Sequence, residues 1–148
     1  MKQVLLTKIT LFTLPLLLLM ACGSKTSSEP TLTFHENGCS YSGPATVASE
    51  FTLTWIIEDS GHSGFVYALV TLDLGKSVQD LATIPAEDPP PSWVTKLDAD
   101  YQTNPGTYPE SVDLSANARF HEGPLYFVCF FTDEDFAMGA VGPIDVKK

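Results

Sequence analysis

Apolar and polar residues alternate along several segments of the chain, and this period of two is typical of half-buried β-strands. Segment 51–58 places apolar side chains on one face at alternate positions, namely Phe51, Leu53, Trp55 and Ile57. Segment 65–74 is a second long run, rich in Val and Leu. The turn-forming residues at 59–64 therefore predict either a hairpin or a crossing between two sheets.

Three further segments predict strands in the last third of the chain. Segment 111–115 alternates, and segment 125–131 is apolar at every position, as expected for a central strand buried on both faces. Segment 142–146 predicts a short final strand. Pro143 should confine this strand to a sheet edge or to a strand start, because proline has no N–H for the ladder.

One short helix is predicted near the middle of the chain. Ser77 can cap it, and Asp80 stands three residues later in a capping-box position. Pro85 would end it. The residues that would share its apolar face are Val78, Leu81 and Ile84.

Segment 86–93 contains three consecutive prolines, which favour an extended loop over a packed strand. Trp93 at its end would pack this excursion against the rest of the domain. Together the elements predict a mainly β domain over residues 31–148, a Greek-key β-sandwich with one short helix and a Pro-rich loop excursion. The length of 148 residues suits one such domain.

Residues 1–21 have the features of a secretory signal peptide. Lys2 and Lys8 form a short basic region, and the run 9–21 is mostly apolar but shorter than the roughly 20 residues of a membrane-spanning helix. The sequence Leu-Met-Ala-Cys at 19–22 resembles the bacterial lipobox, which implies that Cys22 is lipidated and becomes the first residue of the mature chain. Residues 22–30 would then form the lipidated cysteine and a flexible tether.

A lipidated Cys22 would hold the domain at a membrane, since two or more acyl chains anchor a protein stably. We expect the domain at the cell membrane or the outer membrane, exposed outside the cytoplasm. The chain has 18 Asp and Glu against 8 Lys and Arg, a net charge of −10, and loss of the two signal-peptide lysines gives 6 − 18 = −12. So few basic residues argue against nucleic acid as a partner.

Two cysteines remain after Cys22. Cys39 and Cys129 would enter an oxidising compartment, where a pair of thiols tends to form a disulfide. Closing the long loop between Cys39 and Cys129 would stabilise the fold by about 4–5 kcal/mol in the chain-entropy account. A buried free thiol at Cys129 and a metal-bound thiolate are the alternatives.

The last third of the chain resembles the closing strands of the cupredoxin fold. Segment 126–129 ends in Cys129, and Met138 with Gly139 leads into a final strand at 142–146; segment 55–62 resembles the part that carries the first copper histidine. The wider chain is similar to uncharacterised bacterial lipoproteins. The shared segments are CSYSGP at 39–44, LDLGKSVQDL at 72–81, PPSW at 90–93, PG at 105–106 and LYFVCF at 125–130.

The resemblance implies a fold and leaves the copper site incomplete. A type 1 copper site needs a thiolate, two imidazoles and usually a thioether. Cys129, Met138 and His62 could supply three of these ligands, but Thr132 stands three residues after Cys129, where the second histidine would be needed. We therefore expect no bound metal and no cofactor.

Other residues that could bind a metal or take part in catalysis have simpler structural interpretations. His62 could form a surface metal site with His121 and Glu122, but the histidines His35, His62 and His121 are expected to be unrelated solvated side chains. Segment 61–64 resembles a nucleophile elbow, but Phe65 stands where that motif requires glycine. The acidic groups at 98–100 and 133–135 could bind calcium but are expected to be solvated loops.

Five aromatic residues fall in predicted loops, where they would form a contact surface for a protein or glycan or else cap the core. They are Tyr41, Trp93, Tyr101, Tyr108 and Phe136. No nucleophile has a recognisable base beside it, so we expect no enzymatic activity. The sequence predicts a membrane-anchored lipoprotein with a binding or structural role, and a copper-binding redox protein is the alternative.

Overall fold

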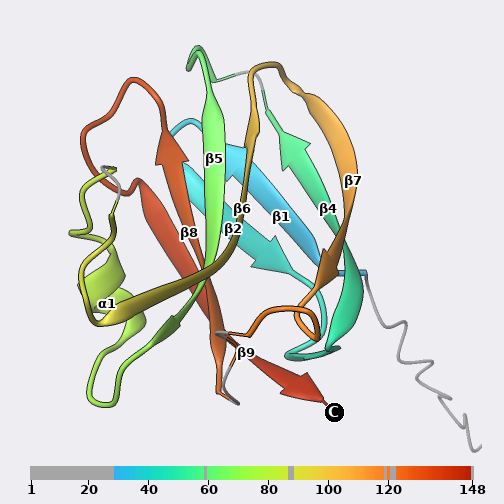
Figure 1. Cartoon of the computed structure of the whole chain (residues 1–148). Coiled ribbons are helices and arrows are strands. Elements are labelled where there is room, and N and C mark those ends of the chain that lie inside the picture. Colours follow the sequence, from blue (N-terminus) through green and yellow to red (C-terminus); the bar gives the residue numbers. More distant parts are fainter. Residues whose placement is uncertain (1–28, 59, 87–88, 119, 121–122, 148) are drawn as a thin grey trace, which may run out of the picture.

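Two mixed β-sheets face each other and form a sandwich (Figure 1). The computed structural model describes residues 29–58, 60–86, 89–118, 120 and 123–147. Sheet I has the order β2-β1-β4-β7, with β1 (Thr31–His35), β2 (Gly38–Ser42), β4 (Glu50–Ile57) and β7 (Gly106–Asp113). Sheet II has the order β3-β9-β8-β5-β6, with β3 (Thr46–Ala48), β5 (Phe65–Leu72), β6 (Val94–Gln102), β8 (Leu125–Phe131) and β9 (Gly139–Lys147). The prediction of a mainly β sandwich with one short helix is confirmed.

The main core lies between the sheets. The predicted alternation in β4 is confirmed, because Leu53, Trp55 and Ile57 are buried while Thr52 and Ile56 are exposed. The side chains that meet them from sheet II include Phe65, Tyr67, Leu69, Phe127 and Phe131. Burial of these large apolar surfaces is the main stabilising contribution to the sandwich.

Strands β4 and β5 lie in different sheets, so the segment between them is a crossing and not a hairpin. Two strand pairs are parallel, β1 with β4 and β3 with β9. Such pairs join segments that are not consecutive in the chain, and the sequence pattern did not predict them.

Strand β8 is the middle strand of sheet II, as its continuous apolar sequence predicts. Its inner face contributes to the main core. Its outer face packs in a second apolar cluster with residues of the excursion, which is the segment 73–93 between β5 and β6. Figure 1 shows this excursion, with α1 (Val78–Leu81), at the side of sheet II.

The predicted helix cap is confirmed. The Asp80 carboxylate accepts hydrogen bonds of 2.9 Å from both the backbone N–H and the hydroxyl of Ser77. Leu81 is buried, as its place on the apolar face requires. The helix is a single turn, because Pro85 follows closely.

Two backbone hydrogen bonds connect the excursion to the β8–β9 loop. Ala86 donates its N–H to the carbonyl of Asp135, and Ala137 donates to the carbonyl of Ile84, both at 2.9 Å. Trp93 packs against the second apolar cluster, as expected, and the Lys76 ammonium lies 4.7 Å from the centre of its indole ring.

The sequence predictions for Pro143 and for three of the aromatic residues are wrong. Pro143 is neither in an edge strand nor at a strand start, because β9 begins at Gly139 and lies between β3 and β8. The strand tolerates proline there because the β8–β9 register shifts at this point, and β3 pairs only with residues 145–147. In addition, three of the aromatic residues expected in loops lie in strands: Tyr41 in β2, Tyr101 in β6 and Tyr108 in β7.

Candidate binding site

The predicted pairing of Cys39 with Cys129 is present as a disulfide with an S–S distance of 1.99 Å. It joins β2 in sheet I to β8 in sheet II. Cys129 is fully buried. Its sulfur is bonded to Cys39, so it offers no thiolate to a metal ion.

His62 lies in the crossing between β4 and β5, and both of its ring nitrogens have partners. Its Nδ1 lies 3.0 Å from both carboxylate oxygens of Asp133, and its Nε2 lies 3.1 Å from the carbonyl oxygen of Glu36. The ring stacks on Phe131, with 3.9 Å between the ring centres. The hydrogen bond to Asp133 raises the pKa of His62 above its ordinary value, although partial burial opposes this shift.

Cys129, Met138 and His62, which could have supplied three copper ligands, therefore do not form a type 1 copper site. Met138 lies beside Cys129, to whose carbonyl its N–H donates at 2.9 Å. His62 contacts Phe131 and the loop at Asp133. Within the described ranges, no three His, Cys, Asp or Glu side chains are grouped so that they could hold a metal ion.

The structure also shows where most of the other candidate site residues lie. His35 pairs with Glu58 at 2.7 Å, and Gly61, with a positive φ of 80°, lies in a turn within the crossing. Asp98 and Asp100 lie in the edge strand β6 and not in a loop. Cys22, His121 and Glu122 lie outside the described residues.

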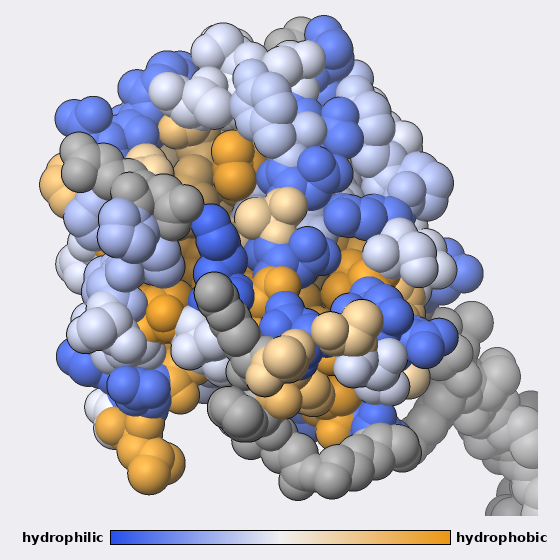
Figure 2. Space-filling model, in the orientation of Figure 1, coloured by the Kyte–Doolittle hydropathy of each residue, from blue (hydrophilic) through white to orange (hydrophobic). Residues whose placement is uncertain are grey.

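A pocket of about 330 Å³ lies on the outer face of sheet II, between the strands and the excursion. We call it the outer groove. Figure 2 shows apolar residues in a hollow on this face, with hydrophilic residues around it. Its lining residues are Val66, Ala68, Val70, Ile84, Pro85, Ala86, Pro90, Val94, Lys96, Ala99, Val128, Phe130, Phe131, Thr132 and Glu134.

The hollow exists because one row of side chains across the sheet is small. Ala68 is paired with Val128 of β8 on one side and with Ala99 of β6 on the other. On the outer face of β5, the next side chains on either side of Ala68 are Val66 and Val70, and each of them belongs to a row with larger side chains. One of these rows contains Phe130, Val66 and Tyr101, and the other contains Tyr126, Val70 and Lys96. The floor of the groove therefore has a trough at the Ala68–Ala99 pair.

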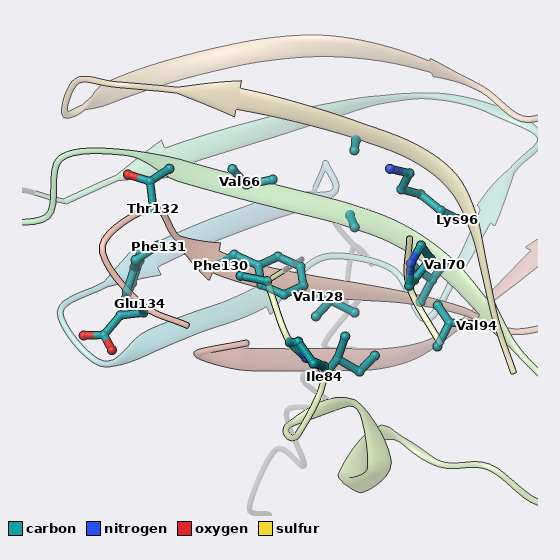
Figure 3. Close-up of a pocket in the computed structure, with 15 residues that line it drawn as sticks. Val66, Val70, Ile84, Val94, Lys96, Val128, Phe130, Phe131, Thr132 and Glu134 are labelled. Atoms are coloured by element: carbon teal, nitrogen blue, oxygen red, sulfur yellow. The ribbon is translucent and has the colours of Figure 1, made fainter. Parts of the chain in front are cut away.

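The excursion and the β8–β9 loop form the wall. Pro85 and Pro90 have no N–H groups, and the N–H of Ala86 is bonded to Asp135. Figure 3 shows Phe130 in the middle of the groove, with Lys96 toward one end and Glu134 toward the other. The Glu134 carboxylate points away from Phe130 in this view.

The predicted aromatic surface is divided between two roles. Tyr41 and Tyr108 pack against the main core. Tyr101 and Phe136 keep 49% and 55% of their surface exposed, and Tyr101 pairs across the strands with Val66 of the groove.

The chain matches no family model, no curated protein and no solved structure.

The sequence pattern did not predict the outer groove. The segment that forms β6 was not predicted as a strand, because the bulge opposite Leu69 and Val70 interrupts its alternation. The Ala68–Ala99 pair becomes visible only once the register of β5 and β6 is known.

Proposed function

We propose that this chain is an exported lipoprotein without enzymatic activity, held at a membrane by acyl chains on Cys22, and that its sandwich binds an apolar ligand in the outer groove. The outer groove is the observation that carries the binding role. Small-molecule sites are concave and mainly apolar, with volumes that start near 300 Å³. The groove has these properties. Without a ligand, its apolar surface would be exposed to water, which is unfavourable and is typical of an interaction site.

Photochemical labelling tests the binding role on the full chain in phospholipid vesicles. An uncharged hydrocarbon probe that carries a diazirine should crosslink to segments 84–86 and 94–102. Ala99→Leu should reduce this labelling at least tenfold, because Ala99 is exposed on the groove floor and a larger side chain would fill the trough. Ser111→Leu on the exposed face of β7 is the matched control. Equal labelling of wild type and Ala99→Leu would refute the binding role.

The anchoring role rests on residues 1–22, which lie outside the described part of the chain. Among the residues that the structure describes, no helix has the length and apolar character needed to cross a membrane. Radiolabelled palmitate should be incorporated into the wild type and not into Cys22→Ala. An absence of label in the wild type would contradict a lipid anchor.

The copper-type redox alternative would require Cys129 as a free thiolate. Because that sulfur is bonded to Cys39, no observation favours this alternative.

A further inference from the structure

The outer groove extends along the strands on both sides of Phe130 (Figure 3). Its lining continues to Lys96 in one direction and to Glu134 in the other. Alternate residues of β5 line it from Val66 to Val70, a distance of about 13 Å at about 3.3 Å per residue. An extended peptide of about five residues spans the same distance, and its alternate side chains point to one face.

The excursion wall of the groove, where the structure describes it, offers backbone acceptors and no free backbone N–H group. Pro85 and Pro90 have no N–H, and the N–H groups of Ile84 and Ala86 are already hydrogen-bonded. Within the described part of the chain, no hydrogen bond reaches the carbonyl oxygens of Pro85, Ala86 and Pro90. A ligand that covered these oxygens without donating to them would bind about fivefold or more weakly for each oxygen left unpaired. The wall therefore favours a ligand with hydrogen-bond donors, which a hydrocarbon chain lacks.

The floor of the groove sets the opposite requirement, because it is apolar. Its side chains include Val66, Ala68, Val70, Val128 and Phe130. A ligand with polar groups on every face, such as a sugar, would bury hydroxyl groups there without partners. An extended peptide meets both requirements, since its N–H groups lie along its edges and its side chains on one face can all be apolar.

The two ends of the groove carry opposite charges. Lys96 has a non-covalent partner of its own. At the other end, Asp133 is paired with His62, whereas neither Glu134 nor Asp135 forms an ion pair with another described residue. Glu134 is exposed, and its carboxylate points away from the middle of the groove (Figure 3). A cationic group just beyond the apolar part of a ligand would complement this acidic end.

We propose that the ligand of the outer groove is an extended peptide segment with apolar side chains at alternate positions and a basic side chain at the end that lies near Glu134. This inference rests on the proposed function, because it names the ligand class of the same groove. The apolar side chains lie on the floor on both sides of Phe130, and their burial supplies most of the affinity. The N–H groups along one edge of the peptide donate to the carbonyl oxygens of the excursion wall.

The test uses the peptide acetyl-Lys-Ser-Val-Ser-photoleucine-Ser-Val-amide, in which photoleucine carries a diazirine. It is titrated against the full chain in phosphatidylcholine vesicles, and crosslinks are mapped by mass spectrometry. We expect crosslinks in segments 84–86 and 94–102. Ala99→Leu should reduce this labelling at least tenfold, whereas Ser111→Leu should keep it. Near-UV circular dichroism checks that both variants are folded.

Changes in the peptide test each contact separately. N-methylation of one alternate set of amides should weaken labelling at least tenfold, and N-methylation of the other set should have a much smaller effect, because only one edge faces the wall. Glutamine in place of the peptide lysine should weaken labelling about two- to fivefold, as expected for an exposed ion pair. Glu134→Gln should abolish this difference between the two peptides, and Glu50→Gln on sheet I should not.

Three outcomes would overturn the inference. If neither N-methylated peptide labels more weakly, the wall carbonyls are not acceptors and the ligand is not a peptide. If the lysine and glutamine peptides label the wild type equally, no cationic group is recognised at Glu134. If the hydrocarbon probe labels the groove and none of the peptides does, the peptide inference fails alone. If neither the hydrocarbon probe nor any peptide labels the groove, the proposed binding role fails as well.

Discussion

The Tyr67 hydroxyl donates a hydrogen bond of 2.8 Å to the carboxylate of Glu110, and this contact links sheet II to sheet I. The Trp55 indole N–H donates to the same carboxylate oxygen, also at 2.8 Å. Tyr67 and Trp55 have no exposed surface. Burial raises the pKa of Glu110 above its ordinary value, although the two hydrogen bonds act in the opposite direction.

The pKa of Glu110 predicts a pH dependence of stability. Because the folded-state pKa is raised, Glu110 contributes stability that is fully present below its ordinary pKa of 4.5 and is lost as the pH rises through the folded-state value. The free energy of unfolding in urea should therefore fall over this range in the wild type relative to Glu110→Gln. Glu50→Gln, which removes an exposed carboxylate from β4, should not reproduce the change. A parallel pH dependence of wild type and Glu110→Gln would contradict the assignment.

The Cys39–Cys129 disulfide should contribute strongly to stability, because its cysteines are 90 residues apart. Replacing both cysteines with alanine should lower the free energy of unfolding by about 3–5 kcal/mol. Urea unfolding with and without a reductant measures the effect. The reductant should destabilise the wild type and leave the double variant unchanged. If the wild type tolerates reduction without loss of stability, the bridge is not a major contributor.

The His62–Asp133 pair should be most stabilising in mildly acidic solution. The raised pKa of His62 gives stability that is fully present below 6.5 and is lost as the pH rises through the folded-state value. The hydrogen bond to His62 lowers the pKa of Asp133, so its part is present above 3.8 and is lost as the pH falls through the folded-state value. The pair therefore contributes fully between about pH 3.8 and 6.5.

NMR titration of the His62 ring measures this pair directly. Asp133→Asn should move the pKa of His62 back toward 6.5 and remove its part of the pH dependence. Asp135→Asn, a neutralisation two residues away in the same loop, is the control. An unchanged His62 titration in Asp133→Asn would exclude the hydrogen bond as the cause.

The edge strand β6 is protected against pairing with another chain. The N–H groups of Ala99 and Tyr101 donate to the carboxylates of Asp98 and Asp100, at 2.9 and 2.7 Å. Native edge strands commonly use such charged side chains to prevent strand addition. Asp100→Ala should therefore increase concentration-dependent association in sedimentation experiments. Asp145→Ala removes one exposed carboxylate from β9 and should not do so. Equal association of the two variants would show that the loss of charge alone matters.

Local sequence patterns predicted the elements that depend on contacts between residues close together in the chain. The alternation in β4, the continuous apolar run of β8 and the Ser77–Asp80 cap are confirmed. Each depends on contacts that repeat every two residues or lie within one turn of helix. The disulfide was also predictable, because only two cysteines remain once Cys22 is assigned to the anchor.

The sequence by itself thus determined a mainly β sandwich, its central strand and its disulfide. The tertiary structure alone decided the parallel pairs, the bulge that holds Pro143, the contact between His62 and Asp133, and the outer groove. These features join residues far apart in the chain; Ala68 and Ala99 are 31 positions apart and face each other only through the β5–β6 register. A shift of one residue would turn each side chain to the opposite face, so the groove is fixed by strand register and not by local pattern.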